Sequence, residues 1–164
     1  MSAHKPLEGV KVVELASFVA APTAGRMMAE MGADVIRVES TAGDPWRFYG
    51  ANCGLPITDE ENPLFDIYNL GKKDIQLNTK TPEGKEILFH LLDEADVFIT
   101  NNRLKSLVRS GLDYESLKDR FPKLIYGLVT GYGQTGPDVD APGYDGVAFF
   151  SRSGMLADMA EPSG

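Results

Sequence analysis

The sequence predicts an α/β fold built on a mostly parallel sheet. Three observations support this: five short β-like runs alternate with helix-like segments, apolar residues repeat at helical spacing between them, and Gly or Pro stands where helices should begin or end. Strands that alternate with helices pair in parallel through right-handed crossovers. In such sheets, ligands lie outside the carboxyl ends of the strands.

The first two strands are expected at residues 10–15 and 34–39. Between them, Pro22 suits the first position of a helix, and Gly32 suits the left-handed position that ends one. Between Pro22 and Gly32, apolar residues repeat at i, i+3, i+4 and i+7, the spacing of one helix face: Ala24, Met27, Met28 and Met31. The methionines among them are expected to fill the core.

The turn after the first strand lacks the glycines of a dinucleotide-binding unit. Such a unit carries Gly-x-Gly-x-x-Gly there, so that its backbone can close on a pyrophosphate. Residues 16–25 read Ala-Ser-Phe-Val-Ala-Ala-Pro-Thr-Ala-Gly instead. The strand order and Glu39 keep an NAD(P)-dependent oxidoreductase domain as an alternative, but the missing glycines count heavily against it.

The middle of the chain opens with a long irregular stretch, from Ser40 to about Gly71, whose aromatic residues argue against disorder. Lys72 and Lys73 then read as solvated charges at the start of a third strand, 74–78. Thr81 and Pro82 have the pattern of a helix start. The buried face of that helix is expected to hold Ile87, Leu88, Leu91 and Leu92.

The remaining elements complete a Rossmann-like pattern. A fourth strand is expected at 96–101, two short helices at about 104–110 and 114–120, and a fifth strand at 124–130. The segments that follow the strands are therefore the candidate binding loops: 16–21, 40 onward, 78–81, 101–105 and 131–145.

Composition excludes several classes of protein. Acidic residues outnumber basic ones 24 to 16, and a net charge of −8 argues against a nucleic-acid partner. Cys53 is the only cysteine, and neither His4 nor His90 has a paired ligand, so no metal site is expected. No signal core or membrane-length apolar run stands out, which favours a cytoplasmic protein without a membrane partner.

Three blocks of the sequence resemble family III coenzyme A transferases, in the same order and at similar spacings. They read LEGVKVVELASFVAAPTAGRMMAEMGADVIRVES with GDPWR after it, NLGKKDIQLNTKTPEGKEIL with ADVFITN, and GYGQTGPDVDAPGYD. Within the family, ESTAGDPWR, TNNRLKSLVRSGLDYE and PGYDGVAFFSRSG resemble the 2-hydroxyacyl branch of amino-acid fermentation. The formyl-CoA type typically has Asn-Phe-x-Pro-Gly where this chain has Asn-Asn-Arg-Leu-Lys at 101–105.

The resemblance implies that the strand ends bind coenzyme A as part of an acyl-CoA substrate, without a metal. Ser40 replaces an arginine of the relatives, so Arg37 would have to supply the phosphate contact. The implied contacts are Ser17, Val19, Ala20, Arg37, Ser40, Leu77, Asn78, Lys80, Asn101, Asn102, Arg103, Arg109, Tyr144 and Asp145. A wide Ala-rich turn suits a flat adenine or a pantetheine arm better than a tight pyrophosphate cradle.

Family III enzymes move CoA between an acyl-CoA and a carboxylic acid through an aspartate that forms an anhydride and then an aspartyl thioester. The resemblance places that nucleophile beyond Gly164; Asp145 is a weak alternative, read as structural or substrate-orienting. Residues 1–164 would then be the N-terminal CoA-binding domain, without the second domain and inactive alone. The full-length enzyme would be an interlocked homodimer that uses a small carboxylic acid.

Two simpler interpretations stay open. Arg109 lies near Gly111, where a cation stabilises a helix C-terminus without any ligand, although Lys105 on the same face favours the phosphate contact. The chain could also be a non-catalytic module that holds CoA or only a partner chain.

Overall fold

The computed structural model describes residues 4–58 and 60–160, and these form a parallel five-stranded sheet in the order β3-β2-β1-β4-β5. The strands are β1 (Lys11–Leu15), β2 (Asp34–Glu39), β3 (Lys73–Gln76), β4 (Val97–Thr100) and β5 (Ile125–Leu128). All five predicted strands and the α/β class are confirmed: β2 has the predicted bounds, and the ends of the other strands differ by at most two residues.

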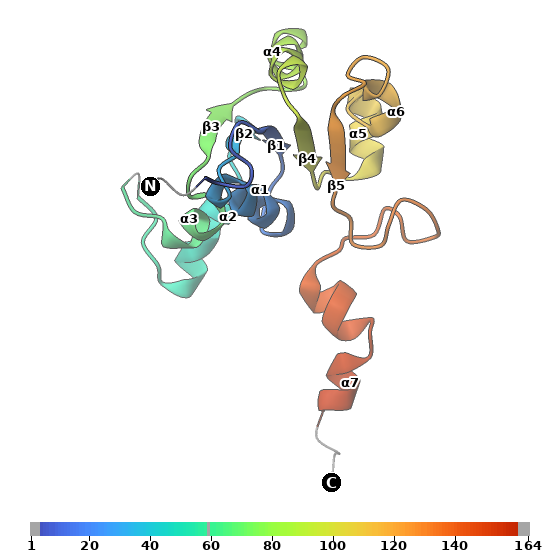
Figure 1. The fold of residues 1–164 in the computed structure, drawn as a ribbon. Helices are drawn as coiled ribbons and strands as arrows, with labels where there is room; N and C mark the ends of the chain where they lie inside the picture. The colour runs from blue at the N-terminus through green and yellow to red at the C-terminus, as the bar shows by residue number, and fades with distance from the viewer. Residues whose placement is uncertain (1–3, 59, 161–164) are drawn as a thin grey trace.

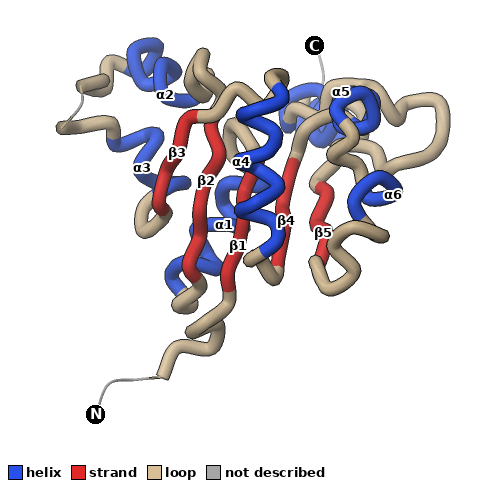
Figure 2. The backbone as a smooth tube through the Cα atoms, turned by 90° about the horizontal axis from the view of Figure 1, so that it is seen from above, coloured by secondary structure: helices blue, strands red, loops and turns tan. Residues whose placement is uncertain are grey.

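Helices cover both faces of the sheet (Figures 1 and 2). On one face, α1 (Ala20–Glu30) packs over a core that includes Val12, Val35 and Ile99. On the other face lie α4 (Pro82–Asp93), α5 (Leu104–Ser110) and α6 (Tyr114–Leu117), over a second core built from alternate residues of the same strands. The alternation follows from the two-residue period of a strand.

Helix α1 lies so close to the sheet that small residues must face it. A Cβ on Gly25 would lie 1.8 Å from Oε2 of the buried Glu14 on β1. The predicted role of the methionines as core residues is therefore wrong for Met27 and Met31, which are 51% and 43% exposed, whereas Met28 packs against the core. Gly32 does end the helix in the left-handed region, at φ 104°.

Helix α4 begins at the predicted position. The Thr81 side chain accepts a hydrogen bond from the Gly84 amide at 3.2 Å, and Pro82 is the first helical residue. Leu88 and Leu92 are fully buried, as predicted, but Ile87 is 44% exposed. The buried face of α4 is therefore narrower than the sequence indicates, because only one side of the helix packs against the sheet.

The stretch between β2 and β3 folds into short elements: α2 (Trp46–Tyr49), the 3₁₀ turn η1 (Gly50–Cys53) and α3 (Pro63–Asn69). The rings of Trp46 and Tyr49 stack at 4.6 Å between centroids, and the Trp46 indole donates to the Leu64 carbonyl at 3.1 Å. The aromatic residues of this stretch therefore hold it together.

After β5 the chain leaves the sheet. The backbones of Gly131 and Gly143 meet, since a Cβ on Gly131 would lie 2.4 Å from the Gly143 Cα atom. The π-helical turn η2 (Gly146–Ser151) and α7 (Met155–Met159) then form a separate arm (Figure 1). None of the helices in the described part of the chain is both long and apolar enough to cross a bilayer.

Candidate functional site

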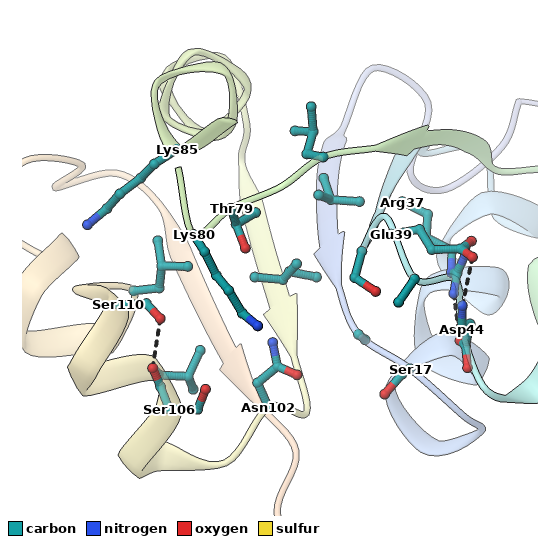
Figure 3. A pocket seen from close by; sticks show the side chains of 18 of the residues that line it. Ser17, Arg37, Glu39, Asp44, Thr79, Lys80, Lys85, Asn102, Ser106 and Ser110 are labelled. Atoms are coloured by element: carbon teal, nitrogen blue, oxygen red, sulfur yellow. Dashed lines mark hydrogen bonds and ion pairs between the residues drawn. The ribbon is translucent and has the colours of Figure 1, made fainter. Parts of the chain in front are cut away.

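A cavity of about 820 Å³ opens at the carboxyl ends of the strands. Its walls come from the segments after β1, β2, β3 and β4, and Figure 3 shows their side chains converging on it. The chain runs outward from β1 through β2 to β3 and then crosses to β4 on the other side of β1. The strand order thus reverses between β1 and β4, which is where open α/β sheets bind ligands.

The cavity brings together half of the predicted site residues. Those that line it are Ser17, Arg37, Ser40, Leu77, Lys80, Asn102 and Arg109. They come from the segments of four different strands, so the parallel sheet brings these predicted residues together at one cavity.

The other predicted site residues lie outside the cavity lining: Val19, Ala20, Asn78, Asn101, Arg103, Tyr144 and Asp145. Val19 and Ala20 begin α1, and Arg103 precedes α5. Tyr144 is 56% exposed beside the Phe18 ring, and the Asp145 carboxylate accepts from the Gly146 amide at 2.9 Å. The exposed Asn78 side chain accepts from the Lys80 amide at 3.2 Å.

Asn101 acts through the backbone of the first loop. Its side chain accepts a hydrogen bond from the Ser17 amide at 3.0 Å and donates one to the Ser17 carbonyl at 2.7 Å. These two hydrogen bonds join the ends of β1 and β4 at the switch point. Asn101 therefore fixes the position of Ser17, which lines the cavity, without lining it itself.

Besides Arg37, three cations line the cavity: Lys80, Lys85 and Arg109. None of them forms an ion pair with any residue that the structure describes. Lys85 on α4 lies beside the end of α5, since a Cβ on Gly111 would be 3.4 Å from its Nζ. Figure 3 shows Lys80 directed toward Asn102. Cations without a protein partner in a concave site can bind an anionic ligand.

Sequence reasoning missed Lys85, Ser106 and Ser110, which also line the cavity. A signal was available: Asn102, Ser106, Arg109 and Ser110 are spaced three and four residues apart, so they share one face of α5 and the turn before it. The Ser110 hydroxyl donates to the Ser106 backbone carbonyl at 2.9 Å, one turn earlier in α5.

Arg37 differs from its predicted role. It is fully buried, and its guanidinium donates to Asp44 at 2.6 Å, to Asp74 at 2.9 Å and to Glu39. Among its nitrogens only Nε has no hydrogen-bond partner, and it lies 3.6 Å from a Glu14 carboxylate oxygen. Arg37 is thus surrounded by carboxylates, which does not fit the phosphate contact expected of it.

A cross-strand row explains this cluster. In the sheet register, Glu14 of β1 pairs with Arg37 of β2, which pairs with Asp74 of β3. Lys72 completes the row: its Nζ lies 2.8 Å from a Glu14 carboxylate oxygen, with its side chain 1% exposed. The expectation that Lys72 is a solvated charge is therefore wrong, whereas Lys73 is 68% exposed, as predicted.

Burial and pairing compete in this cluster. Burial raises the pKa of Glu14 and lowers that of Lys72, and it also raises the pKa of Asp74. For Glu39 burial acts upward too, but hydrogen bonds from Arg47 and Arg37 outweigh it and lower the pKa to about 2. In dinucleotide-binding units the acid at the end of the second strand accepts hydrogen bonds from a ribose. Glu39 is instead a fixed anion engaged by two arginines, which leaves it unsuited to that role.

The described residues contain no group of three His, Cys, Asp or Glu side chains placed to bind a metal ion. The acids nearest the cavity, Glu39 and Asp44, are buried and paired with arginines. The arrangement can therefore hold an anionic ligand in an open concave site, and it presents no free carboxylate as an attacking group.

Comparisons with known proteins agree with this geometry. Residues 7–164 match the sequence profile of CoA-transferase family III. The chain is 52% identical over 153 residues to cinnamoyl-CoA:phenyllactate CoA-transferase of Clostridium sporogenes, which covers 93% of this chain and 37% of that protein. It is 46% identical over 155 residues to (R)-2-hydroxy-4-methylpentanoate CoA-transferase of Clostridioides difficile, with 94% and 39% covered.

Among solved structures, a CAIB/BAIF family protein from Brucella suis superposes with a TM-score of 0.88 at 41% identity. The match covers 98% of this chain and 42% of that one. The chain therefore spans about two fifths of the length of the relatives that it matches.

Proposed function

The chain belongs to CoA-transferase family III, and from this premise we propose that its cavity binds coenzyme A as the N-terminal domain of a CoA-transferase. The observation that carries the proposal is a set of three cations at the switch point of the sheet that form no ion pair with the residues the structure describes: Lys80, Lys85 and Arg109. CoA carries a diphosphate and a 3′-phosphate, and charge-assisted hydrogen bonds to phosphate are among the strongest in proteins.

The proposed contacts start from the cavity wall. Lys80, Lys85 and Arg109 would take the phosphates, and Ser17, Ser40, Leu77 and Asn102 would line the path of the nucleotide or the pantetheine arm. Val19, Ala20, Asn78, Arg103, Tyr144 and Asp145 remain proposed contacts from outside the cavity lining. Tyr144 makes an edge-to-face contact with Phe18, the residue after the cavity-lining Ser17, at 5.8 Å between ring centroids.

The proposed reaction is the transfer of CoA from an acyl-CoA to a carboxylic acid through an aspartyl anhydride and thioester. In each step the carboxylate or thiolate attacks a carbonyl carbon, and the thiolate or carboxylate leaves, so that no oxidant or reductant is needed. Asp145 is bound to the Gly146 amide at the start of η2, which supports a structural role. The attacking aspartate is therefore proposed to lie C-terminal to residue 164.

The proposed acid is a 2-hydroxy acid. The support is similarity to the two clostridial enzymes, whose names give phenyllactate and 2-hydroxy-4-methylpentanoate as substrates. An interlocked homodimer and a cytoplasmic location complete the proposal. The oxidoreductase alternative is disfavoured because Glu39, the acid expected to bind a ribose, is buried between Arg37 and Arg47.

Isothermal titration calorimetry with CoA, 3′-dephospho-CoA and NAD tests the binding part. We expect CoA to bind and NAD not to bind, with dephospho-CoA weaker by the loss of one charged contact, roughly tenfold or more. Equal affinity for CoA and NAD would contradict the proposal.

A transfer assay tests the catalytic part. This chain and a longer polypeptide that contains it are assayed with phenyllactate, 2-hydroxyisocaproate and lactate against several acyl-CoAs. We expect transfer by the longer polypeptide and none by residues 1–164. Turnover by the short chain that Asp145→Asn abolishes would instead make Asp145 the nucleophile.

A further inference from the structure

The turn that joins β1 to α1 holds an unusual backbone conformation. Phe18 has φ 63°, the left-handed region that bulky residues rarely adopt. Among the described non-glycine residues it is the one with positive φ. Such a conformation persists only where its surroundings impose it, and it is found at ligand sites more often than elsewhere.

Two side chains from neighbouring strand ends hold this turn. Asn101, after β4, binds both backbone polar groups of Ser17. On the other side, the Phe18 amide donates to both carboxylate oxygens of Asp44, at 3.2 and 3.3 Å. Ser17 and Asp44 both line the cavity, so the strained turn is part of its wall.

The Asp44 carboxylate is itself fixed. Arg37 donates to it at 2.6 Å, and the Trp46 amide donates to it at 2.9 Å. The Asp44 amide donates in turn to Glu39 at 2.7 Å, and the residue is 2% exposed. Figure 3 shows the contact between Arg37 and Asp44. Through it, the buried row of charges across the sheet is connected to the carboxylate that binds the Phe18 amide.

We propose that Asp44, held by Arg37, is a positioning residue for the CoA cavity, because it keeps Phe18 in the left-handed conformation and so places Ser17 in the wall. The proposal rests on the proposed CoA-binding function. It assigns to the buried Arg37 an indirect part in ligand binding, through Asp44 and the backbone, in place of a direct phosphate contact. The turn is held in its binding shape before the ligand arrives, and preorganisation of this kind raises affinity.

The test exploits glycine, which adopts positive φ without strain. Asp44→Glu keeps a negative charge beside Arg37 but moves the acceptor oxygens away from the Phe18 amide. We expect CoA to bind to this variant roughly tenfold or more weakly in calorimetry, the value of a charged hydrogen bond. Adding Phe18→Gly should restore most of the lost affinity, because the turn no longer needs to be held.

Val19→Gly in the Asp44→Glu background is the matched control, and each glycine variant is also measured alone, because Val19 is itself a proposed CoA contact. Val19 lies in the same turn at φ −115°, so glycine there adds flexibility without relieving strain. It should restore nothing. Equal rescue by Phe18→Gly and Val19→Gly, or no rescue by either, would overturn the proposal.

The two proposals fail in different ways. If the unaltered protein does not bind CoA, the proposed function fails. If it does bind and Asp44→Glu binds with unchanged affinity, only the positioning role fails. Circular dichroism checks folding, and a variant that does not fold is replaced by Asp44→Asn with the same two glycine partners. If neither variant folds and Phe18→Gly restores neither, Asp44 serves the fold alone and the proposal is wrong.

Discussion

Two groups of cations in this fold differ in almost everything but charge. Arg37, Arg47 and Lys72 are each bonded to carboxylates, and the side chains of Arg37 and Lys72 are 1% exposed. Lys80, Lys85 and Arg109 face the cavity and have no ion-pair partner in the described part of the chain. The difference shows that pairing, more than residue type or nearness to a strand end, separates a structural cation from a ligand-facing one.

The largest expected effect comes from removing Arg37, which forms ion pairs with three carboxylates. Arg37→Met would leave Glu39, Asp44 and Asp74 without their shared cation, and removing one partner of a buried ion pair costs about 3–5 kcal/mol. We expect the free energy of unfolding in urea to fall by that amount. Lys73→Met is the control, since its pair with Asp34 is exposed and is worth at most about 1 kcal/mol. Equal losses would erase the distinction between the two groups.

Acid should weaken the ion pairs that Glu39 forms with Arg37 and Arg47. The pKa of Glu39 in the folded protein is about 2, below its ordinary value of 4.5, so its contribution to stability is present above pH 4.5 and is lost as the pH falls toward 2. Burial raises the pKa of Glu14 and Asp74, which favours the folded state in acid and offsets part of that loss. Thermal unfolding followed against pH should show a smaller slope for Glu39→Gln, and an unchanged slope would contradict the assignment.

A smaller effect, on binding and not on folding, is expected from the cavity side. Arg109→Ala should weaken CoA binding by roughly 1.5–3 kcal/mol, a ten- to hundredfold change in Kd. The free energy of unfolding of this variant should fall by no more than about 1 kcal/mol, the usual contribution of an exposed cation at a helix C-terminus. Lys105→Ala is the matched control, because Lys105 lies on the same helix outside the cavity lining. If the affinity for CoA is unchanged and only the free energy of unfolding falls, Arg109 stabilises the C-terminus of α5 and does not contact the ligand.

Local sequence patterns predicted most of the sheet. The five strands, the Thr81 cap and the Gly32 stop depend on residues near one another in the chain, and all are present. Half of the candidate site residues line the cavity, because parallel topology alone brings the strand ends together.

The errors arose where distant segments meet. The partners of Arg37 depend on the register that aligns it with Glu14 and Asp74, and Lys72 is buried because its Nζ bonds Glu14 of β1 and the Pro22 carbonyl of α1. A charged residue within an apolar strand was the available signal, since it needs a partner when buried. The exposure of Met27 and Met31 follows from the close approach of α1 to Glu14, which helical periodicity cannot reveal.

That close approach also limits how the protein can be engineered. Replacing a glycine inside a helix by alanine is a routine stabilising substitution, worth about 1 kcal/mol where space allows. At Gly25 the added methyl group would occupy the volume of the Glu14 carboxylate, which holds Lys72 in the sheet. A mutational scan of α1 should therefore find its least tolerant position at the residue that a helix-propensity scale would mark first for improvement.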